Sequence, residues 1–394
     1  MASSEQIRYS AEKVIALIKQ GHQVVVVVSA MSGETDRLIR LAQSMSILPS
    51  PREQAALIST GEQVAAALMA IYLQERGHPA LSLSASQIPI RTTPDYLNAR
   101  ISDIDTTAVL AALKEGKTPV IAGFQGIDQA GYVTTLGRGG SDTTAVAIAA
   151  VLQAEECQIF TDVDGVYTCD PRLVPEARRL ARVTVDEMLE LASLGAKVLQ
   201  KRSVELAGKY RVNLRVLSSM VEGPGTLITF EENEMETPLV SGLACHRNEA
   251  KLSVRGVPDS LGVTVALIEP LSLANIDIDM LVQHTSMQGT VDLTFTVSRD
   301  HYLKAFELLE IASHSLEAKE ISGDQNIAKI SLVGVGMRSH PEIPTKMFKI
   351  LAKENIAIQL IASGEIKVSV IIDEKYLELA ARSLHAGFGL GEGE

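Results

Sequence analysis

Residues 134–161 read TTLGRGGSDTTAVAIAAVLQAEECQIFT, a glycine-rich loop followed by an apolar stretch of helix length and a short apolar strand. Similar strand candidates, separated by helical stretches such as 52–76, lie at residues 24–28, 80–83, 119–122 and 213–216. The five valines at 24–28 indicate a strand that is buried on both faces of a parallel sheet. This alternation predicts an α/β domain in which helices and a mainly parallel sheet form layers.

Composition and charge disfavour several classes of protein. The 394 residues are enough for two or three domains, and 36 basic against 48 acidic residues leave a net charge of −12. Such an acidic chain has no electrostatic footprint for nucleic acid or anionic lipid. Its longest apolar run, the ten residues 64–73, is too short to span a bilayer, and no leader pattern opens the chain. We therefore expect no nucleic-acid or membrane partner.

The cysteines and histidines predict no metal site. Cys157, Cys169 and Cys245 match neither a disulfide framework nor a metal-binding motif, and the eight histidines are scattered. Reduced thiols in a cytoplasmic protein are the expected state.

The strand and helix pattern ends in a turn-rich and acidic stretch at residues 222–238. Beyond it, residues 355–362 repeat the apolar alternation of residues 275–282, eighty positions earlier. This repetition predicts two units with the order strand, helix, strand, strand, helix, strand. We therefore expect domains at residues 1–236, 237–325 and 326–394.

The glycine-rich loop is the first candidate for chemistry. Glycines let a backbone approach a ligand closely, the start of the following helix favours an anion, and Arg138 offers a bidentate partner for carboxylate or phosphate. A capped turn without a ligand is the structural alternative, but Arg138, Ser141 and Asp142 in one turn favour an anion cradle. No P-loop motif is present, and the pair Gly334 and Gly336 has Ser339 in place of a third motif glycine.

A second candidate, residues 161–172 (TDVDGVYTCDPR), follows a predicted strand, and open α/β sheets bind ligands at such strand ends. Its carboxylates, aromatic ring and arginine suit a nucleotide, although Asp170 before Pro171 is also typical of a plain turn. Two shorter pieces, residues 29–33 and 59–62, stand at a strand end and a helix start.

Several of these pieces together resemble the aspartate kinases of the amino-acid kinase fold, namely residues 29–35, 59–63, 122–126, 134–144, 161–172, 192–197 and 224–228. The repeats resemble the paired ACT regulatory domains of that family. The resemblance covers essentially the whole chain. It implies a cytoplasmic enzyme that uses ATP and Mg²⁺ to phosphorylate the side-chain carboxylate of L-aspartate. The product would be 4-phospho-L-aspartate, the first step toward lysine, threonine and methionine.

The resemblance also implies roles for matching residues. Arg138 and Glu62 are expected to bind the carboxylate and ammonium groups of aspartate, with Asp142 organising the site and with neighbouring contacts from Ser29, Thr35, Gly139, Gly140 and Ser141. The catalytic set is Arg138, Ser141 and Asp142. The nucleotide is expected at Thr161, Asp162, Tyr167, Arg172 and Lys197. Lysine or threonine as effectors are expected at Asp259, Asn275, Ile276, Asp277, Gln283, Asn355, Ile356, Gln359, Ser363 and Glu365, in a homo-oligomer assembled through the ACT units.

The chain departs from the family pattern in two places. Nothing matches the Lys-Phe-Gly-Gly-Thr-Ser segment, so we expect either that an upstream sequence encodes it or that the chain is a truncated paralogue. The alternative functions are a non-catalytic, amino-acid-binding regulatory paralogue and a glutamate-type kinase of the same fold. Glu342 replaces a flexible glycine in the second effector turn, and Pro344 follows it. These changes predict weakened or altered inhibition by lysine and threonine.

Overall fold

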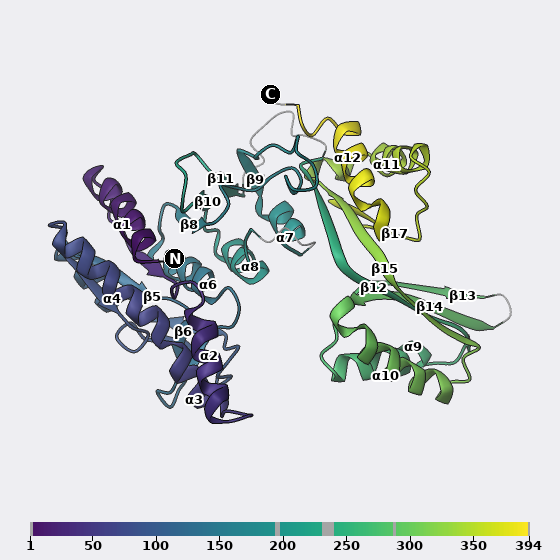
Figure 1. Ribbon diagram of the computed structural model, residues 1–394, viewed down its shortest axis with the longest axis horizontal. Helices are drawn as coiled ribbons and strands as arrows, with labels where there is room; N and C mark the ends of the chain where they lie inside the picture. Colours follow the sequence, from purple (N-terminus) through teal and green to yellow (C-terminus); the bar gives the residue numbers. More distant parts are fainter. Residues whose placement is uncertain (1–2, 194–197, 231–239, 287–288, 393–394) are drawn as a thin grey trace. The chain divides into compact units, whose positions relative to one another are not determined.

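The computed structural model describes residues 3–193, 198–230, 240–286 and 289–392. The chain divides into two compact units (Figure 1). Unit 1 contains Met1–Val166, Arg179–Ala192 and Lys197–Glu232, and unit 2 contains Tyr167–Arg178, Ser193–Ala196 and Asn233–Glu394. The segment Tyr167–Arg178 thus groups with unit 2, although the sequence pattern places it inside residues 1–236.

Parallel strand pairs dominate two of the sheets in unit 1. Their orders are β1(Val26–Val28), β5(Thr118–Ala122), β2(Ala80–Leu83) and β8(Cys157–Thr161), β10(Leu214–Ser218), β11(Thr226–Thr229), β9(Arg182–Thr184). A third sheet consists of β4(Ile101–Ile104), β3(Ile90–Thr92), β6(Gln125–Ile127) and β7(Val133–Thr135). Every residue of β5 is buried, because β1 and β2 flank it in parallel and helices cover both of its faces.

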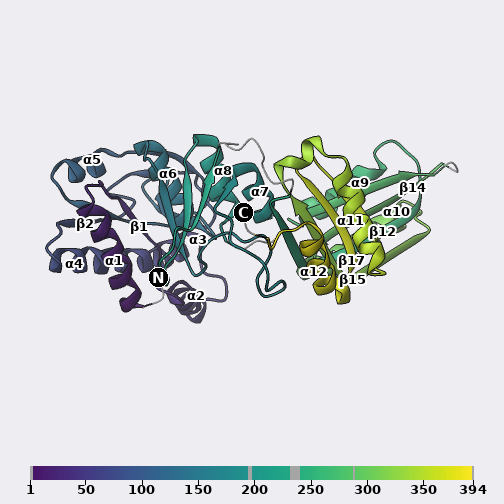
Figure 2. The same ribbon diagram turned by 90° about the horizontal axis from the view of Figure 1, so that it is seen from above.

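Helices cover both faces of the β1-β5-β2 sheet (Figure 2). The core on one face is formed with α1(Ser4–Lys19) and α4(Thr60–Glu75), and the core on the other face with α5(Thr107–Lys114) and α6(Gly140–Leu152). The remaining helices of unit 1 are α2(Glu34–Met45), α3(Pro51–Ile58), α7(Val185–Ser193) and α8(Lys201–Tyr210). This arrangement confirms the layered α/β class.

The first strand is shorter than the run of valines predicts. β1 covers Val26–Val28, and only Val28 is fully buried. Within the described residues β1 pairs with β5 alone, so its other edge has no strand beside it. A strand with one neighbour shields its side chains less than the strand buried on both faces that the sequence predicts.

The long apolar stretch 51–75 is sufficient in length and composition to cross a membrane. It consists of α3 and α4, and half of its most apolar window is buried inside the protein. The hydroxyls of Ser59 and Thr60 donate to the carbonyl oxygens of Ala56 and Leu57 at 2.9 and 2.7 Å, and such bonds bend helices. Met69 and Leu73 are fully buried against α1, as expected of a core helix.

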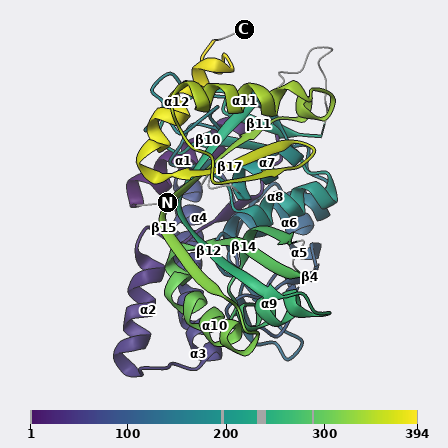
Figure 3. The same ribbon diagram turned by 90° about the vertical axis from the view of Figure 1, so that its right-hand side faces the viewer.

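In the part of unit 2 that the structure describes, four α-helices pack on a six-stranded sheet. The strand order is β13(Ile278–Thr285), β14(Thr290–Ser298), β12(Gly242–Pro258), β15(Glu320–Val333), β17(Lys367–Asp373), β16(Leu360–Ser363), and every neighbouring pair is antiparallel. One core lies under α9(Val263–Leu273) and α10(Tyr302–Ser315), and the other under α11(Glu342–Lys353) and α12(Leu377–Gly387). The two helix pairs lie toward opposite ends of the long strands β12 and β15 (Figure 3).

The two repeats share these long strands. The first part of β12, residues 242–246, pairs with the end of β15, and residues 249–258 pair with β14 and with the start of β15. Register shifts at Glu249 separate the two parts. Each repeat therefore has four strands, but the second repeat takes one of them from a segment that precedes the first. The expected boundary between residues 325 and 326 falls inside β15.

A buried ion cluster lies where the two parts of β12 meet. Lys329 on β15 is 3% exposed, and its Nζ lies 2.9 Å from Oε1 of Glu249, which is 4% exposed. The same ammonium contacts the carboxylate of Asp279 on β13. Burial alone would lower the pKa of Lys329, but the two carboxylates outweigh it and raise that pKa. Lys329 is therefore charged in the folded protein, where its ammonium group pairs with the buried Glu249 carboxylate.

We expect the Lys329→Ala variant to lose about 3–5 kcal/mol of unfolding free energy, because it leaves the buried Glu249 carboxylate without its cation. The surface pair of Arg91 and Asp103, with side chains 52% and 62% exposed, provides the control. The Arg91→Ala variant should lose less than about 1 kcal/mol. Urea titrations of both variants measure the difference, and equal losses would contradict the prediction.

Candidate active site

The glycine-rich loop shapes the start of α6. Gly137 and Gly139 have φ values of +76° and +70°, which side-chain-bearing residues adopt only with strain. Gly139 is the N-cap of α6, and no side chain caps the helix. The Gly140 N–H donates to the Gly137 carbonyl oxygen at 3.0 Å, so within the described residues the N–H groups of Ser141 and Asp142 remain available to an anion, as the sequence predicts. Arg138 lies exposed between these glycines, and no hydrogen bond or ion pair joins it to another described residue.

The start of α6 packs closely on the turn after β5. A Cβ at Gly140 would lie 2.8 Å from Cδ2 of Phe124, and a Cβ at Gly123 would lie 3.0 Å from Cα of Ser141. The Phe124 backbone N–H donates to Oγ1 of Thr144 at 3.2 Å. Glycine at positions 123 and 140 therefore lets the turn after β5 pack directly on the start of α6, in addition to any role in ligand approach.

We expect Gly139→Ala to destabilise the protein by more than Gly131→Ala. Both positions have positive φ, which costs alanine about 1–2 kcal/mol. A Cβ at position 139 would also lie 2.0 Å from Cγ of Gln200, whereas position 131 is open. Overpacking of this kind adds about 1–3 kcal/mol. Urea titrations measure the difference, and equal losses would show that Gln200 moves aside without cost.

Glu62 joins the start of α4 to the end of β1. Its side chain is 3% exposed, and Oε1 accepts a hydrogen bond from the Ala30 backbone N–H at 3.1 Å. Oε2 is buried without a hydrogen-bond partner among the described residues. Burial raises the pKa of Glu62 to about 7, although the Ala30 N–H acts in the opposite direction. A buried carboxylate with one free oxygen is suited to a cationic ligand.

The carboxyl ends of β1 and β5 bring these features together. The Gly123 backbone N–H donates to the Val28 carbonyl oxygen at 3.0 Å, and Gly123 is also the residue that abuts Ser141. Ser29 follows Val28 directly, and Glu62 holds the next residue, Ala30. These contacts connect Ser29, Glu62 and the Arg138–Asp142 turn in one region, at strand ends where α/β sheets bind ligands. Thr35 lies half-buried in the first turn of α2.

Asp142 is the second acid of this region with a perturbed pKa. It lies half-buried in the first turn of α6, and burial raises its pKa to about 6. No hydrogen bond joins its carboxylate to another described side chain. Perturbed acids of this kind concentrate at functional sites.

Gln125 is a residue of this region to which sequence reasoning assigned no role. It is 1% exposed on β6, and its Oε1 accepts from Nε2 of Gln63 at 3.4 Å. Its own Nε2 is buried and, as far as the structure describes the chain, unpartnered. The sequence does contain one indication of a role for Gln125, because residues 122–126 are among the pieces that resemble the family. A free amide donor beside Gly123 and Phe124 suits a ligand oxygen or an ordered water.

The residues predicted to bind a nucleotide are distributed over both units. Thr161 ends β8 and donates from Oγ1 to Oδ1 of Asp162 at 3.0 Å, both in unit 1. Tyr167 and Arg172 belong to unit 2. The Arg172 side chain is 88% exposed and pairs with Asp170 at 2.7 Å, as the plain-turn interpretation expects. Lys197 lies outside the described residues.

Four of the residues predicted to bind an effector contribute to helix ends or to the cores of unit 2. Asn275 and Asn355 follow α9 and α11 with φ values of +54° and +58°, a conformation that asparagine tolerates at helix ends. Ile276 and Ile356 are buried in the two cores of unit 2, so their side chains serve packing.

The other effector candidates are distributed along the sheet and its loops. Thr264 donates to Oε1 of Gln283 at 2.7 Å, and Lys251 donates to Gln359. The remaining candidates are exposed, namely Asp259, Asp277, Ser363 and Glu365. In the altered second turn, Oε1 of Glu342 lies 2.8 Å from Nδ1 of His340, and Pro344 lies in the first turn of α11.

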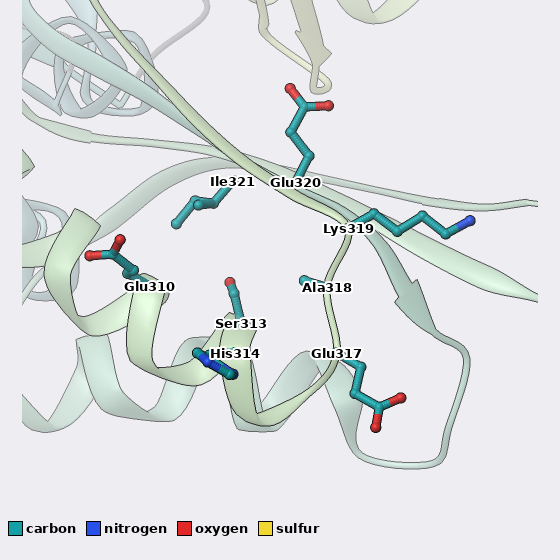
Figure 4. A pocket seen from close by; sticks show the side chains of 8 residues that line it. All are labelled: Glu310, Ser313, His314, Glu317, Ala318, Lys319, Glu320 and Ile321. Carbon is teal, nitrogen blue, oxygen red and sulfur yellow. The ribbon is translucent and has the colours of Figure 1, made fainter.

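A separate pocket of about 580 Å³ lies in unit 2 beside the end of α10. Ser313 is 5% exposed there, and its hydroxyl has no partner within the described parts of the chain. The charged groups of Glu310, Glu317, Lys319 and Glu320 point in different directions (Figure 4). None of the predicted site residues lines this pocket, and its polar groups do not converge on a ligand.

Both units of the chain are similar to parts of known proteins. The profile of the amino acid kinase family matches residues 1–218, and an ACT domain profile matches residues 330–388. An aspartokinase of Pseudomonas aeruginosa is 57% identical over 98% of this chain and 94% of its own length. An aspartate kinase structure from Synechocystis covers 98% of this chain and 68% of its own, with 41% identity and a TM-score of 0.54.

A further structural likeness supports the fold. E. coli aspartokinase III, solved in complex with aspartate and ADP, covers 98% of this chain and 97% of its own length with a TM-score of 0.80 and 24% identity. At that identity the likeness concerns the fold. The resemblance seen in the sequence is confirmed by the identity and coverage of the Pseudomonas relative, and the chain belongs to the aspartokinase family of amino acid kinases.

Proposed function

We propose that this chain transfers the γ-phosphoryl group of ATP to the side-chain carboxylate of L-aspartate and releases 4-phospho-L-aspartate, the first step toward lysine, threonine and methionine. The free, buried Oε2 of Glu62 is the observation that carries the substrate assignment. It offers a negative charge to an ammonium group at the strand ends where the glycine-rich loop also lies. The 57% identity to a named aspartokinase supports the reaction class.

The proposed aspartate pocket matches a zwitterionic amino acid. Glu62 pairs with the ammonium group, and the exposed Arg138 guanidinium binds a carboxylate with two parallel hydrogen bonds. Ser29, Thr35 and Ser141 supply hydroxyl groups, and Gly139 and Gly140 let the substrate approach the turn closely, since neither carries a side chain. Binding the ammonium group removes the cost of an unpaired buried acid, so substrate binding should lower the pKa of Glu62.

The chemical step requires positioning more than proton transfer. The attacking side-chain carboxylate is already ionised at neutral pH, so no general base is needed. Phosphoryl transfer depends on in-line placement and on donors that neutralise the spreading negative charge. The Ser141 hydroxyl and the backbone N–H groups of Ser141 and Asp142 are the donors assigned to that task. Arg138 positions the aspartate through the carboxylate that it binds, and the Asp142 side chain organises the turn.

ATP with Mg²⁺ is the proposed cosubstrate. Mg²⁺ accompanies the phosphates, where it neutralises their charge and orients them. Asp142 would hold the ion, because its half-buried carboxylate lies at the start of α6 and has no described side-chain partner. Thr161, Asp162, Tyr167, Arg172 and Lys197 are proposed to hold the nucleotide.

Unit 2 is proposed to bind lysine or threonine and to assemble the cytoplasmic protein into a homo-oligomer. Strand β13 has a single strand neighbour and exposes Leu281 and Val282, which are 49% and 39% accessible. Strand β16 exposes Ile361 in the same way. Exposed apolar side chains on edge strands favour pairing with another copy of a sheet.

Release of ADP that depends on both aspartate and Mg-ATP tests the proposed function. Glutamate in place of aspartate provides the substrate control, and it should support little turnover. Turnover with glutamate would support the other amino-acid kinase activity instead. A protein that binds ATP and lysine or threonine but releases no ADP would support the regulatory paralogue.

A further inference from the structure

Two of the three cysteines come together in unit 2, although 76 positions separate them in the sequence. Cys169 lies in the segment Tyr167–Arg178, and Cys245 lies on β12. The Leu243 backbone N–H donates to the Thr168 carbonyl oxygen at 2.7 Å, so the two backbones lie side by side. Cys169 is buried in a core cluster of unit 2, and Cys245 packs against the same cluster.

The two thiols differ in character. The neighbouring Cys245 thiol lowers the pKa of Cys169, burial opposes this effect, and the Asp170 backbone N–H assists it. The neighbouring Cys169 thiol, together with burial, raises the pKa of Cys245 well above its usual range. Cys169 therefore takes the thiolate form more readily, which is the nucleophilic form. Cys169 is 2% exposed and Cys245 is only partly buried, so a small peroxide would reach Cys169 from the Cys245 side.

We propose that Cys169 and Cys245 form a reversible oxidation site, at which a hydroperoxide converts the two thiols into an intramolecular disulfide. The Cys169 thiolate attacks a peroxide oxygen, the O–O bond breaks, and Cys169 becomes a sulfenic acid as the first water is released. The Cys245 sulfur then attacks the Cys169 sulfur and displaces the hydroxyl as the second water. Two thiols and one hydrogen peroxide thus yield one disulfide and two waters.

The surrounding contacts hold the two sulfurs near each other before oxidation. Oγ1 of Thr168 lies 2.9 Å from Nε2 of His385, and Nε of Arg178 donates to the Leu390 carbonyl oxygen at 3.2 Å. Val174 is buried in the core cluster that contains Cys169. Together with the bond between Leu243 and Thr168, these contacts hold the segment against β12, α12 and the residues that follow α12.

Cys157 provides a matched control within the same chain. It is 7% exposed on β8 in unit 1, whereas the other two cysteines belong to unit 2. Burial raises the pKa of Cys157 to about 12, which suppresses its thiolate. A peroxide should therefore leave Cys157 reduced at concentrations that oxidise the pair.

The test treats the full chain with hydrogen peroxide, alkylates the remaining thiols in denaturant and digests with trypsin plus an Asp-specific protease. This digestion places Cys169 in residues 164–169 and Cys245 in residues 216–247, separate from Cys157. We expect alkylated thiols to fall from three to one per chain and a peptide pair linked through Cys169 and Cys245. Dithiothreitol should restore all three thiols.

Three cysteine-to-serine variants show which thiols form the disulfide. Cys157→Ser should still form the linked peptide pair, whereas Cys169→Ser and Cys245→Ser should not form it. The proposal is overturned if Cys169 and Cys245 both remain alkylated after peroxide treatment. It is also overturned if Cys157 is oxidised at the same peroxide concentration, or if the linked peptides join two chains in place of one.

Discussion

In the Glu62→Gln variant, we expect kcat/KM for aspartate to fall about 100-fold, mainly through a higher KM. Glu62 is buried with a free oxygen, so its proposed contact to the substrate ammonium stabilises a charge that glutamine does not carry. Loss of one partner of a buried charge pair costs about 3 kcal/mol, and about 1.4 kcal/mol corresponds to tenfold. Initial rates at varied aspartate measure this effect. An unchanged KM for aspartate would contradict the assignment.

The pH dependence of kcat/KM provides an independent test of Glu62. Its pKa is raised to about 7, so the free enzyme loses the negative charge of Glu62 as pH falls below that value. We therefore expect kcat/KM for aspartate to fall on the acid side of about pH 7, since this parameter reports groups of the free enzyme. Glu62→Gln should abolish that limb and leave a lower one, to which Asp142 with a pKa near 6 contributes.

Stability measurements distinguish lost binding from misfolding in the same variant. Because burial raises the pKa of Glu62 above its unfolded value, this acid favours folding at low pH and opposes it once pH rises through about 7. Glu62→Gln keeps an acceptor for the Ala30 N–H and removes the buried charge. We therefore expect the ligand-free variant to be at least as stable as the parent at pH 8. A large loss of stability would mean that misfolding explains the kinetic effect.

The second large effect is expected for Arg138→Ala, which should lower kcat/KM for aspartate about 100- to 10,000-fold. Hydrogen bonds to charged groups contribute about 1.5–3 kcal/mol each, and a guanidinium forms two with a carboxylate. Arg138→Lys should recover part of the loss, because it restores the charge without the fork geometry. Steady-state kinetics with varied aspartate compare the three proteins.

Two controls accompany this prediction. Arg138 is exposed without a described partner, so neither substitution should change the unfolding free energy by more than about 0.5 kcal/mol. Arg91→Ala removes another exposed arginine of unit 1 and should leave the kinetics unchanged. A loss of activity that Arg91→Ala shares would indicate a general charge effect.

The layered fold and the glycine-rich loop could be predicted from the sequence because their signals are local. Strand and helix runs alternate within short windows, and glycines with positive φ lie next to Arg138. The free oxygen of Glu62 could not be predicted, because it depends on α4 meeting the end of β1. The position of Gln125 against Gln63 depends in the same way on two elements 62 residues apart.

Unit 2 shows where local signals mislead. The first half of β15, residues 320–326, is polar and largely exposed, so no alternation marks it as a strand. Its pairing with β12 creates that half of the strand. Likewise, the segment Tyr167–Arg178 follows β8 in sequence, yet Cys169 and Val174 are buried in a core whose other members begin at Val240. Only contacts between residues far apart in the sequence show to which core such residues belong.

The sharing of β12 and β15 determines how the regulatory half can be dissected. A fragment of residues 326–394 would lack residues 242–246, so the inner edge of its sheet would be open and prone to association. We therefore expect that cutting the chain between the repeats does not yield two modules that fold independently. Evolution faces the same constraint, since duplicating, deleting or exchanging one repeat would disrupt strands on which its neighbour depends.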